Sequence, residues 1–306
     1  MEIYQLRYFA AVAEMGNFTK AALKCNISQP SLSQQIINLE AELKQQLFHR
    51  LGRKITLTPA GQMLLERSRK ILMEVDNAVK ELGDEHKAQQ RVAVGAIPTL
   101  APYLMPKIIA RCRMNHPNLE VSTYEDFLPY LVEAVVDGEI DLAFASLPIR
   151  DRRVTVETLF KEPLLLALSP EHPLSERKAI TAKDLIDEKF IMLGTSSSVS
   201  AQIRSFCGDN NFEPKVLHRC SQIKTLKLLV GLGLGIAILP AGTFSPEDEQ
   251  TLIYRELSGR GVPIREVALI RHPGRYLNRG TEMFIATVRD TLARAPIPIL
   301  PQISES

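Results

Sequence analysis

The chain contains 306 residues, of which 45% are hydrophobic and 24% are charged. These proportions are typical of a globular protein, and the length is enough for two or three domains with buried cores. No apolar run approaches the roughly eighteen residues that a membrane span requires, so no contact with a membrane is expected. The formal net charge is only +2, so any affinity for nucleic acid must come from local clusters of cations.

The cysteines and the first residues indicate the cellular setting. Four cysteines lack the short paired spacings of a zinc site or a disulfide scaffold: Cys25, Cys112, Cys207 and Cys220. We therefore predict no metal site, no cofactor and a reducing compartment. The chain does not start with a basic segment followed by an apolar one, which favours a cytoplasmic location.

Two short helices and a turn near the N-terminus predict a helix-turn-helix. Apolar side chains share one face of a helix over residues 3–15, and a second helix is expected over residues 18–24. Ser28 is a suitable N-cap for a third helix, and Pro30 falls in its first turn, where a missing N–H costs nothing. The first residues of such a third helix contact base edges in the major groove.

Seven residues of this segment, all polar except Pro30, are therefore candidates for contact with a double-stranded DNA operator. They are Thr19, Ser28, Gln29, Pro30, Ser31, Ser33 and Gln34. Glutamine can pair with adenine, and serine can serve several bases. The alternative interpretation is an ordinary solvated helix surface.

Residues 47–58 predict a small hairpin, which we call the wing. It carries Arg50, Arg53 and Lys54, whose charges suit phosphate contacts that set position on the duplex rather than sequence preference. Ordinary surface charge is the alternative interpretation of these three residues.

Residues 59–87 predict one long helix, with Thr58 as its N-cap and Pro59 in its first position. The helix would be roughly 40 Å long. Apolar and small residues alternate spacings of four and three, as in paired helices: Leu64, Ser68, Ile71, Val75, Ala78 and Leu82. We expect dimerisation through this helix. The alternative is a long helix packed on its own domain.

From residue 91 onward, strand and helix patterns alternate. Strands are expected over 91–95, 119–124, 140–146, 163–168, 190–193 and 267–270, and helices over 100–115, 130–137 and 279–292. This layout predicts an α/β fold with a parallel sheet. Two lobes crossed twice by the chain would leave a cleft, where ligands usually bind.

Two loops at strand ends supply the polar groups of that cleft. The run Gly194-Thr-Ser-Ser-Ser198 follows a strand and precedes a helix, so its hydroxyls and free N–H groups suit an anion or a small polar ligand. A well-capped helix is the alternative. A ligand could bridge this run and Thr99 in the other lobe. The predicted effector-pocket residues are Thr99, Thr195, Ser196, Ser197, Ser198, Cys207, Arg219 and Ser221.

The order of these parts resembles the LysR-type transcriptional regulators over nearly the whole chain. The motifs are Phe18-Thr19-x-Ala21-Ala22, Ser28-Gln29-Pro30-Ser31-x-Ser33, Leu39-Glu40, Leu47-Phe48-x-Arg50 and Leu57-Thr58-x-x-Gly61. The resemblance implies a winged helix-turn-helix domain over 1–58, a dimerising linker helix over 59–88, and a two-lobed domain like a periplasmic solute-binding protein over 89–306. Lobe I would comprise about 91–161 and 266–298, and lobe II about 162–265.

The same resemblance implies a non-enzymatic protein that forms homotetramers and regulates transcription, with RNA polymerase as a further partner. The sequence is most similar to the peroxide-sensing OxyR branch, a group of activators of the oxidative stress response. The supporting segments are Ala96-Ile-Pro-Thr99-Leu-Ala-Pro-Tyr-Leu-Met-Pro106, Leu159-Phe160-x-Glu162-Pro163 and Ile238-Leu-Pro240.

One position departs from that branch in a way that matters for chemistry. The branch has a reactive cysteine nine residues before a resolving cysteine, whereas this chain has Ser198 before Cys207. Leu128 also stands where the branch has a cleft threonine. Peroxide is reduced by a thiolate, and a serine hydroxyl neither ionises near neutral pH nor forms a disulfide. The chain is either a relative that senses a small polar or carboxylate metabolite or a cysteine-to-serine variant of a peroxide sensor.

Two other classes of protein fit the sequence less well. A free solute-binding protein would need a leader and no helix-turn-helix. An α/β enzyme would need a catalytic constellation, and no serine–histidine–acid arrangement or metal-ligand cluster stands out among the six histidines. We therefore expect no catalytic residues.

Overall fold

The computed structural model describes residues 1–51, 54–84, 90–177 and 179–294, with the backbone alone at residues 50, 51, 54, 80, 83 and 84. The chain divides into two compact units. The first consists of Met1–Lys87 with Gly274–Asn278, and the second of Ala88–Pro273 with Arg279–Ser306. No helix in the described part is both long enough and apolar enough to cross a membrane.

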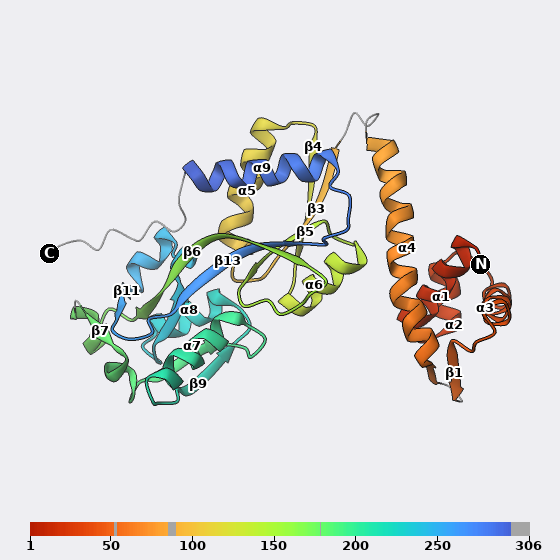
Figure 1. Cartoon of the computed structure of the whole chain (residues 1–306). Coiled ribbons are helices and arrows are strands. Elements are labelled where there is room, and N and C mark those ends of the chain that lie inside the picture. The colour runs from red at the N-terminus through yellow and green to blue at the C-terminus, as the bar shows by residue number, and fades with distance from the viewer. Residues whose placement is uncertain (52–53, 85–89, 178, 295–306) are drawn as a thin grey trace. The chain divides into compact units, whose positions relative to one another are not determined.

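The first unit is a three-helix domain with a hairpin and a long helix (Figure 1). Its elements are α1 (Ile3–Met15), α2 (Phe18–Lys24), α3 (Gln29–Leu43), β1 (Phe48–Leu51), β2 (Lys54–Leu57) and α4 (Pro59–Asp84). The short helices start where small polar side chains accept backbone N–H bonds: Asn17 accepts from Lys20, and Ser28 accepts from Ser31. Their apolar faces meet in one core that includes Phe9, Leu32, Ile36, Leu39 and Leu65.

The antiparallel hairpin of β1 and β2 is fixed to the helices by local contacts. The Glu40 carboxylate accepts hydrogen bonds from the backbone N–H groups of Leu47, at 2.8 Å, and Phe48, at 3.3 Å. Thr58 caps α4 by accepting from the Gly61 N–H at 2.9 Å. A Cβ atom on Gly61 would lie 2.1 Å from the Leu47 carbonyl oxygen, so only glycine allows this close approach.

The long helix α4 has two different halves. In the first half Leu65 and Ser68 are buried and Leu72 packs against the core of the three-helix domain. In the second half Val79 is 68% exposed and Leu82 is 81% exposed. The apolar stripe that was expected to pair with a second helix therefore packs partly within this domain. Its apolar side chains near the end of α4 lie on the surface.

The second unit begins with lobe I, an α/β layer built around one core (Figure 1). Lobe I contains β3 (Gln90–Ala96), α5 (Ala101–Asn115), β4 (Leu119–Glu125), α6 (Leu128–Asp137), β5 (Leu142–Ser146) and α9 (Arg279–Arg294). Its apolar strand residues include Val94, Leu142 and Phe144, which are fully buried. The long strands β6 (Thr155–Leu168) and β13 (Ile264–Arg271) connect this lobe to lobe II.

Lobe II has a core on each face of its strands. Its longer elements are β8 (Lys189–Leu193), α7 (Ser198–Asp209), β9 (Lys215–Cys220), α8 (Ile223–Gly231) and β10 (Ala237–Pro240). Its short elements are η1 (Pro173–Glu176), β7 (Ile180–Thr181), η2 (Ala182–Leu185), η3 (Ala241–Thr243), η4 (Pro246–Gln250), β11 (Ile253–Arg255) and β12 (Leu257–Ser258). Alternate strand residues face opposite sides: Phe190 and Met192 pack in the core that contains α7 residues, while Ile191 and Leu193 pack in the core that contains α8 residues.

The α/β fold class is confirmed, and the sheet is mixed where a parallel sheet was expected. The main sheet has the order β10-β6-β13-β5-β3-β4. Strand β3 is parallel to β4 and β5, and β8 is parallel to β9, but β13 is antiparallel to both β5 and β6. The physical reason is that β6 and β13 carry the chain between the lobes in opposite directions.

Candidate functional site

The start of α3 forms the exposed surface expected to contact DNA. Gln29, Pro30, Ser31 and Gln34 are exposed, and Ser33 is half-buried. Ser28 is exposed but holds the helix start, and its hydroxyl lies 2.7 Å from that of Ser31. Thr19, on α2, is exposed as well.

The free polar groups of this surface are mainly amides. The Gln34 side chain donates to Asn38 at 3.0 Å, which orients its amide along the helix and leaves its carbonyl oxygen able to accept. In the wing, Arg50 belongs to β1 and Lys54 to β2. Arg53 lies outside the described residues, so the wing cations remain predictions.

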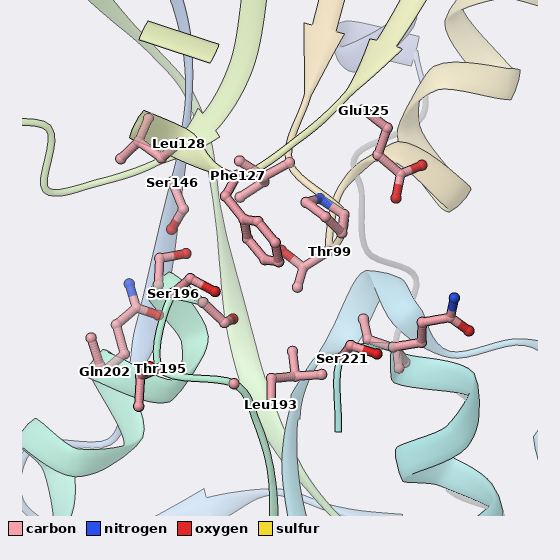
Figure 2. Close-up of a pocket in the computed structure, with 18 of the residues that line it drawn as sticks. Thr99, Glu125, Phe127, Leu128, Ser146, Leu193, Thr195, Ser196, Gln202 and Ser221 are labelled. Atoms are coloured by element: carbon pink, nitrogen blue, oxygen red, sulfur yellow. The ribbon is translucent and has the colours of Figure 1, made fainter. Parts of the chain in front are cut away.

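A pocket of about 660 Å³ lies between the two lobes of the second unit. Lobe I contributes Thr99 after β3, Phe127 and Leu128 at the start of α6, and Ser146 at the end of β5 (Figure 2). Lobe II contributes the end of β8 and the start of α7, from Leu193 to Ser198, together with Gln202 and Ser221. The volume is in the range of pockets that take a small organic ligand.

The most informative polar groups of the pocket are at the start of α7. Ser197 is the N-cap residue, and Ser198 is the first residue of the helix. The hydroxyl oxygens of both are buried and have no hydrogen-bond partner among the described residues, and the same is true of the Gln202 Oε1 atom. Buried polar atoms are normally paired, so partnerless ones in a pocket indicate where a ligand or water binds.

Gln202 also connects the two lobes. Its side-chain amide donates to the Leu147 carbonyl oxygen of lobe I at 3.3 Å. Ser198 and Gln202 are four residues apart, so they share one face of α7. Sequence reasoning missed Gln202, although its spacing from Ser198 within one helix was a usable signal.

The lining suits a ligand with an apolar body and an oxygen-rich end. Ile97, Phe127, Leu128 and Leu193 supply apolar surface. The N–H groups at the start of a helix carry partial positive charge and bind anions. The charged rim residues Glu125 and Lys224 are exposed and opposite in sign, so they add no net charge to the pocket.

Thr99 is hydrogen-bonded to one member of a buried ion pair. It is only 5% exposed, and its hydroxyl accepts from Arg265 Nη1 at 2.8 Å. Arg265 on β13 pairs with Glu162 on β6, and both side chains are fully buried. Sequence reasoning missed this pair, although opposite charges inside two apolar strands were a signal.

Six of the eight predicted effector residues line the pocket: Thr99, Thr195, Ser196, Ser197, Ser198 and Ser221. The other two lie elsewhere. Cys207 is fully buried in the lobe II core with Ile203 and Phe206, because it is on the α7 face opposite the pocket. Burial raises the pKa of the Cys207 thiol to about 11, with Arg204 opposing that rise. Arg219 is an exposed residue of β9.

Comparisons with known proteins agree with both parts of this structure. Residues 3–62 match the model of the bacterial regulatory helix-turn-helix protein, lysR family, and residues 85–293 match the LysR substrate binding domain. The chain is 33% identical to a hydrogen peroxide-inducible genes activator of Pectobacterium carotovorum subsp. carotovorum, over 95% of this chain and 96% of the relative. It is 36% identical to the regulator BenM of Acinetobacter baylyi, over 80% of this chain and 82% of that protein.

A solved structure shows the same likeness in three dimensions. Full-length OxyR from Pseudomonas aeruginosa, a single-residue variant, superposes with a TM-score of 0.72 at 27% identity, covering 94% of this chain and 98% of that one. The motifs, the fold and these matches lead to one conclusion: the chain belongs to the LysR family of DNA-binding transcriptional regulators.

Proposed function

We propose that this LysR-type regulator binds a small effector with a carboxylate or similar oxyanion and an apolar body in the interlobe pocket. The observation that carries the proposal is the pair of buried, partnerless hydroxyls of Ser197 and Ser198 at the start of α7. A carboxylate could accept from both hydroxyls and from the helix N–H groups, while Phe127 and Leu128 cover the apolar part. Binding would favour one arrangement of the lobes and so change how the assembly holds DNA.

The DNA-binding part of the proposal assigns roles to α3 and the wing. We infer that Gln29 and Gln34 contact base edges, with Ser31, Ser33 and Thr19 close to the duplex. Arg50, Arg53 and Lys54 would contact phosphates. We also infer that the exposed apolar part of α4 pairs with a second copy, that dimers associate into tetramers, and that bound protein reaches RNA polymerase. Dimers would present two recognition helices to half-sites separated by whole helical turns.

The effector proposal is tested by calorimetric titration of the full-length protein with benzoate and with benzamide. We expect benzoate to bind more tightly, because only the carboxylate is an acceptor with a negative charge. Ser198→Ala should weaken benzoate binding about tenfold, which corresponds to one hydrogen bond to a charged group. Ser122→Ala, at an exposed position of β4 outside the pocket, is the matched control and should bind as the wild type does. Equal affinity for the two probes, or no binding of either, would refute the proposal.

The second candidate function is a peroxide response, and it is favoured by the likeness to hydrogen peroxide-inducible activators. Ser198→Cys, treated with hydrogen peroxide, tests it. We expect no disulfide to Cys207 at pH 7, because Cys207 is buried in the core and its raised pKa of about 11 keeps it a thiol. Since the thiolate is the attacking species, any linkage should form faster as pH rises toward 11. Mass spectrometry after alkylation measures the linkage, and rapid formation at pH 7 would favour the redox function.

A further inference from the structure

The ion pair behind Thr99 is part of a four-residue network with little access to water. Arg265 and Glu162 are fully buried, and Arg265 Nε donates to Glu162 Oε1 at 3.0 Å. Arg265 Nη2 also donates to the Tyr103 hydroxyl at 2.8 Å, and that hydroxyl donates to Glu162 Oε2 at 2.7 Å. The fourth member is Thr99, which is also the member that lines the pocket.

The direction of each bond in this network is determined by chemistry. A guanidinium has only donors, and a carboxylate has only acceptors. Burial raises the pKa of the Tyr103 phenol, with the Arg265 charge opposing that rise and Glu162 adding to it. The phenol therefore keeps its proton and donates it to Glu162 while it accepts from Arg265.

The same reasoning determines what Thr99 can offer a ligand. Its hydroxyl oxygen accepts a charge-assisted bond from Arg265 at 2.8 Å. Arg265 cannot accept the threonine proton, and no acceptor for it lies within hydrogen-bond distance among the described residues. The Thr99 O–H group therefore remains able to donate a hydrogen bond to a ligand in the pocket.

The network also packs against lobe II through Tyr103. The ring of Tyr103, on α5 of lobe I, occupies the space next to Gly242 of η3 in lobe II. A Cβ atom on Gly242 would lie 2.5 Å from Tyr103 Cε2. Packing against Gly242 and hydrogen bonds to Arg265 and Glu162 fix the position of Tyr103. Tyr103 in turn helps to fix the Arg265 guanidinium that contacts Thr99.

We propose that Arg265 is a positioning residue that, paired with Glu162, orients Thr99 as a hydrogen-bond donor and so makes the lobe I wall of the pocket selective for acceptor groups. This inference rests on the proposed effector function, and it adds a residue that never touches the ligand. Selectivity would come from both sides of the pocket, with serine hydroxyls from lobe II and a threonine proton from lobe I.

The test combines a ligand-free arm and a ligand-binding arm. In the first, chemical unfolding is measured for the wild type, Thr99→Val, the pair Arg265→Gln with Glu162→Gln, and all three changes together. The glutamine pair removes both charges without leaving either one alone in the core. We expect Thr99→Val to lower the folding equilibrium constant about tenfold more in the wild-type background than in the glutamine background, because it strands a charged donor only in the former.

In the second arm, the ratio of benzoate affinity to benzamide affinity is measured for the same proteins and for Ser122→Ala. We expect the glutamine pair and Thr99→Val each to lower this ratio about tenfold, since either change removes the oriented donor. Ser122→Ala is the matched control, because Ser122 is exposed and lies outside both the pocket and the network, so its ratio should stay that of the wild type.

Three results would contradict the positioning role, the selectivity or the effector function. Additive unfolding effects of the Thr99 and Arg265–Glu162 changes would overturn the positioning role. An unchanged affinity ratio in the glutamine pair would overturn its role in selectivity. If the wild-type protein binds neither probe, the proposed effector function fails, while the unfolding arm still decides whether Arg265 holds Thr99.

Discussion

The double substitution Gln29→Ala with Gln34→Ala is expected to abolish preference for the operator. Both side chains are exposed at the start of α3, and each contact between an amide and a base edge contributes about 1–3 kcal/mol of discrimination. Binding to a selected duplex should therefore weaken by about 1–3 kcal/mol per lost contact. Binding to a scrambled duplex, which depends on phosphate contacts, should remain unchanged.

Fluorescence anisotropy measures this difference with a duplex that the wild-type protein has enriched from a random pool. Gln45→Ala is the matched control, because Gln45 is an exposed glutamine beyond the end of α3. Equal weakening on both duplexes would mean that the two glutamines contact the backbone. An unchanged affinity for the selected duplex would remove α3 from base recognition.

Arg265→Met is expected to destabilise the second unit by about 3–5 kcal/mol. The substitution leaves the fully buried carboxylate of Glu162 without its counter-charge, and an unpaired charge in a core is among the costliest single changes. Urea unfolding followed by circular dichroism measures the loss as a shift of the midpoint.

The double variant Arg265→Met with Glu162→Leu separates charge from packing. Replacing both partners by apolar side chains of similar volume should recover most of the stability lost in the single variant. A single variant as stable as the wild type would show that water or another cation compensates Glu162. A double variant no better than the single would show that packing, rather than the stranded charge, causes the loss.

The first unit could be predicted closely because its signals are local. Asn17 and Lys20, like Ser28 and Ser31, are three residues apart, so the cap and the N–H group it satisfies appear together in the sequence. The apolar spacing of α3 then places Leu32, Ile36 and Leu39 in the core. The side of the helix opposite these three residues is therefore the exposed face.

The pocket could be predicted only in part. The serine run lies in one loop between a strand and a helix, so its position at the pocket is readable from that pattern. Thr99 was identified in the same way. The strand β6 was expected to begin at residue 163 but begins at Thr155, because its first half consists of half-buried and exposed residues and lacks a continuous apolar run.

By itself, the sequence determined the family and the helix-turn-helix, since each rests on residues close together in the chain. Only the tertiary structure decided that Cys207 packs in the lobe II core and not in the pocket. It also brought Arg265 to Glu162, 103 residues away, and to Thr99, 166 residues away. Such pairings depend on how β6 and β13 run between the lobes, and no local pattern specifies which buried charges will meet.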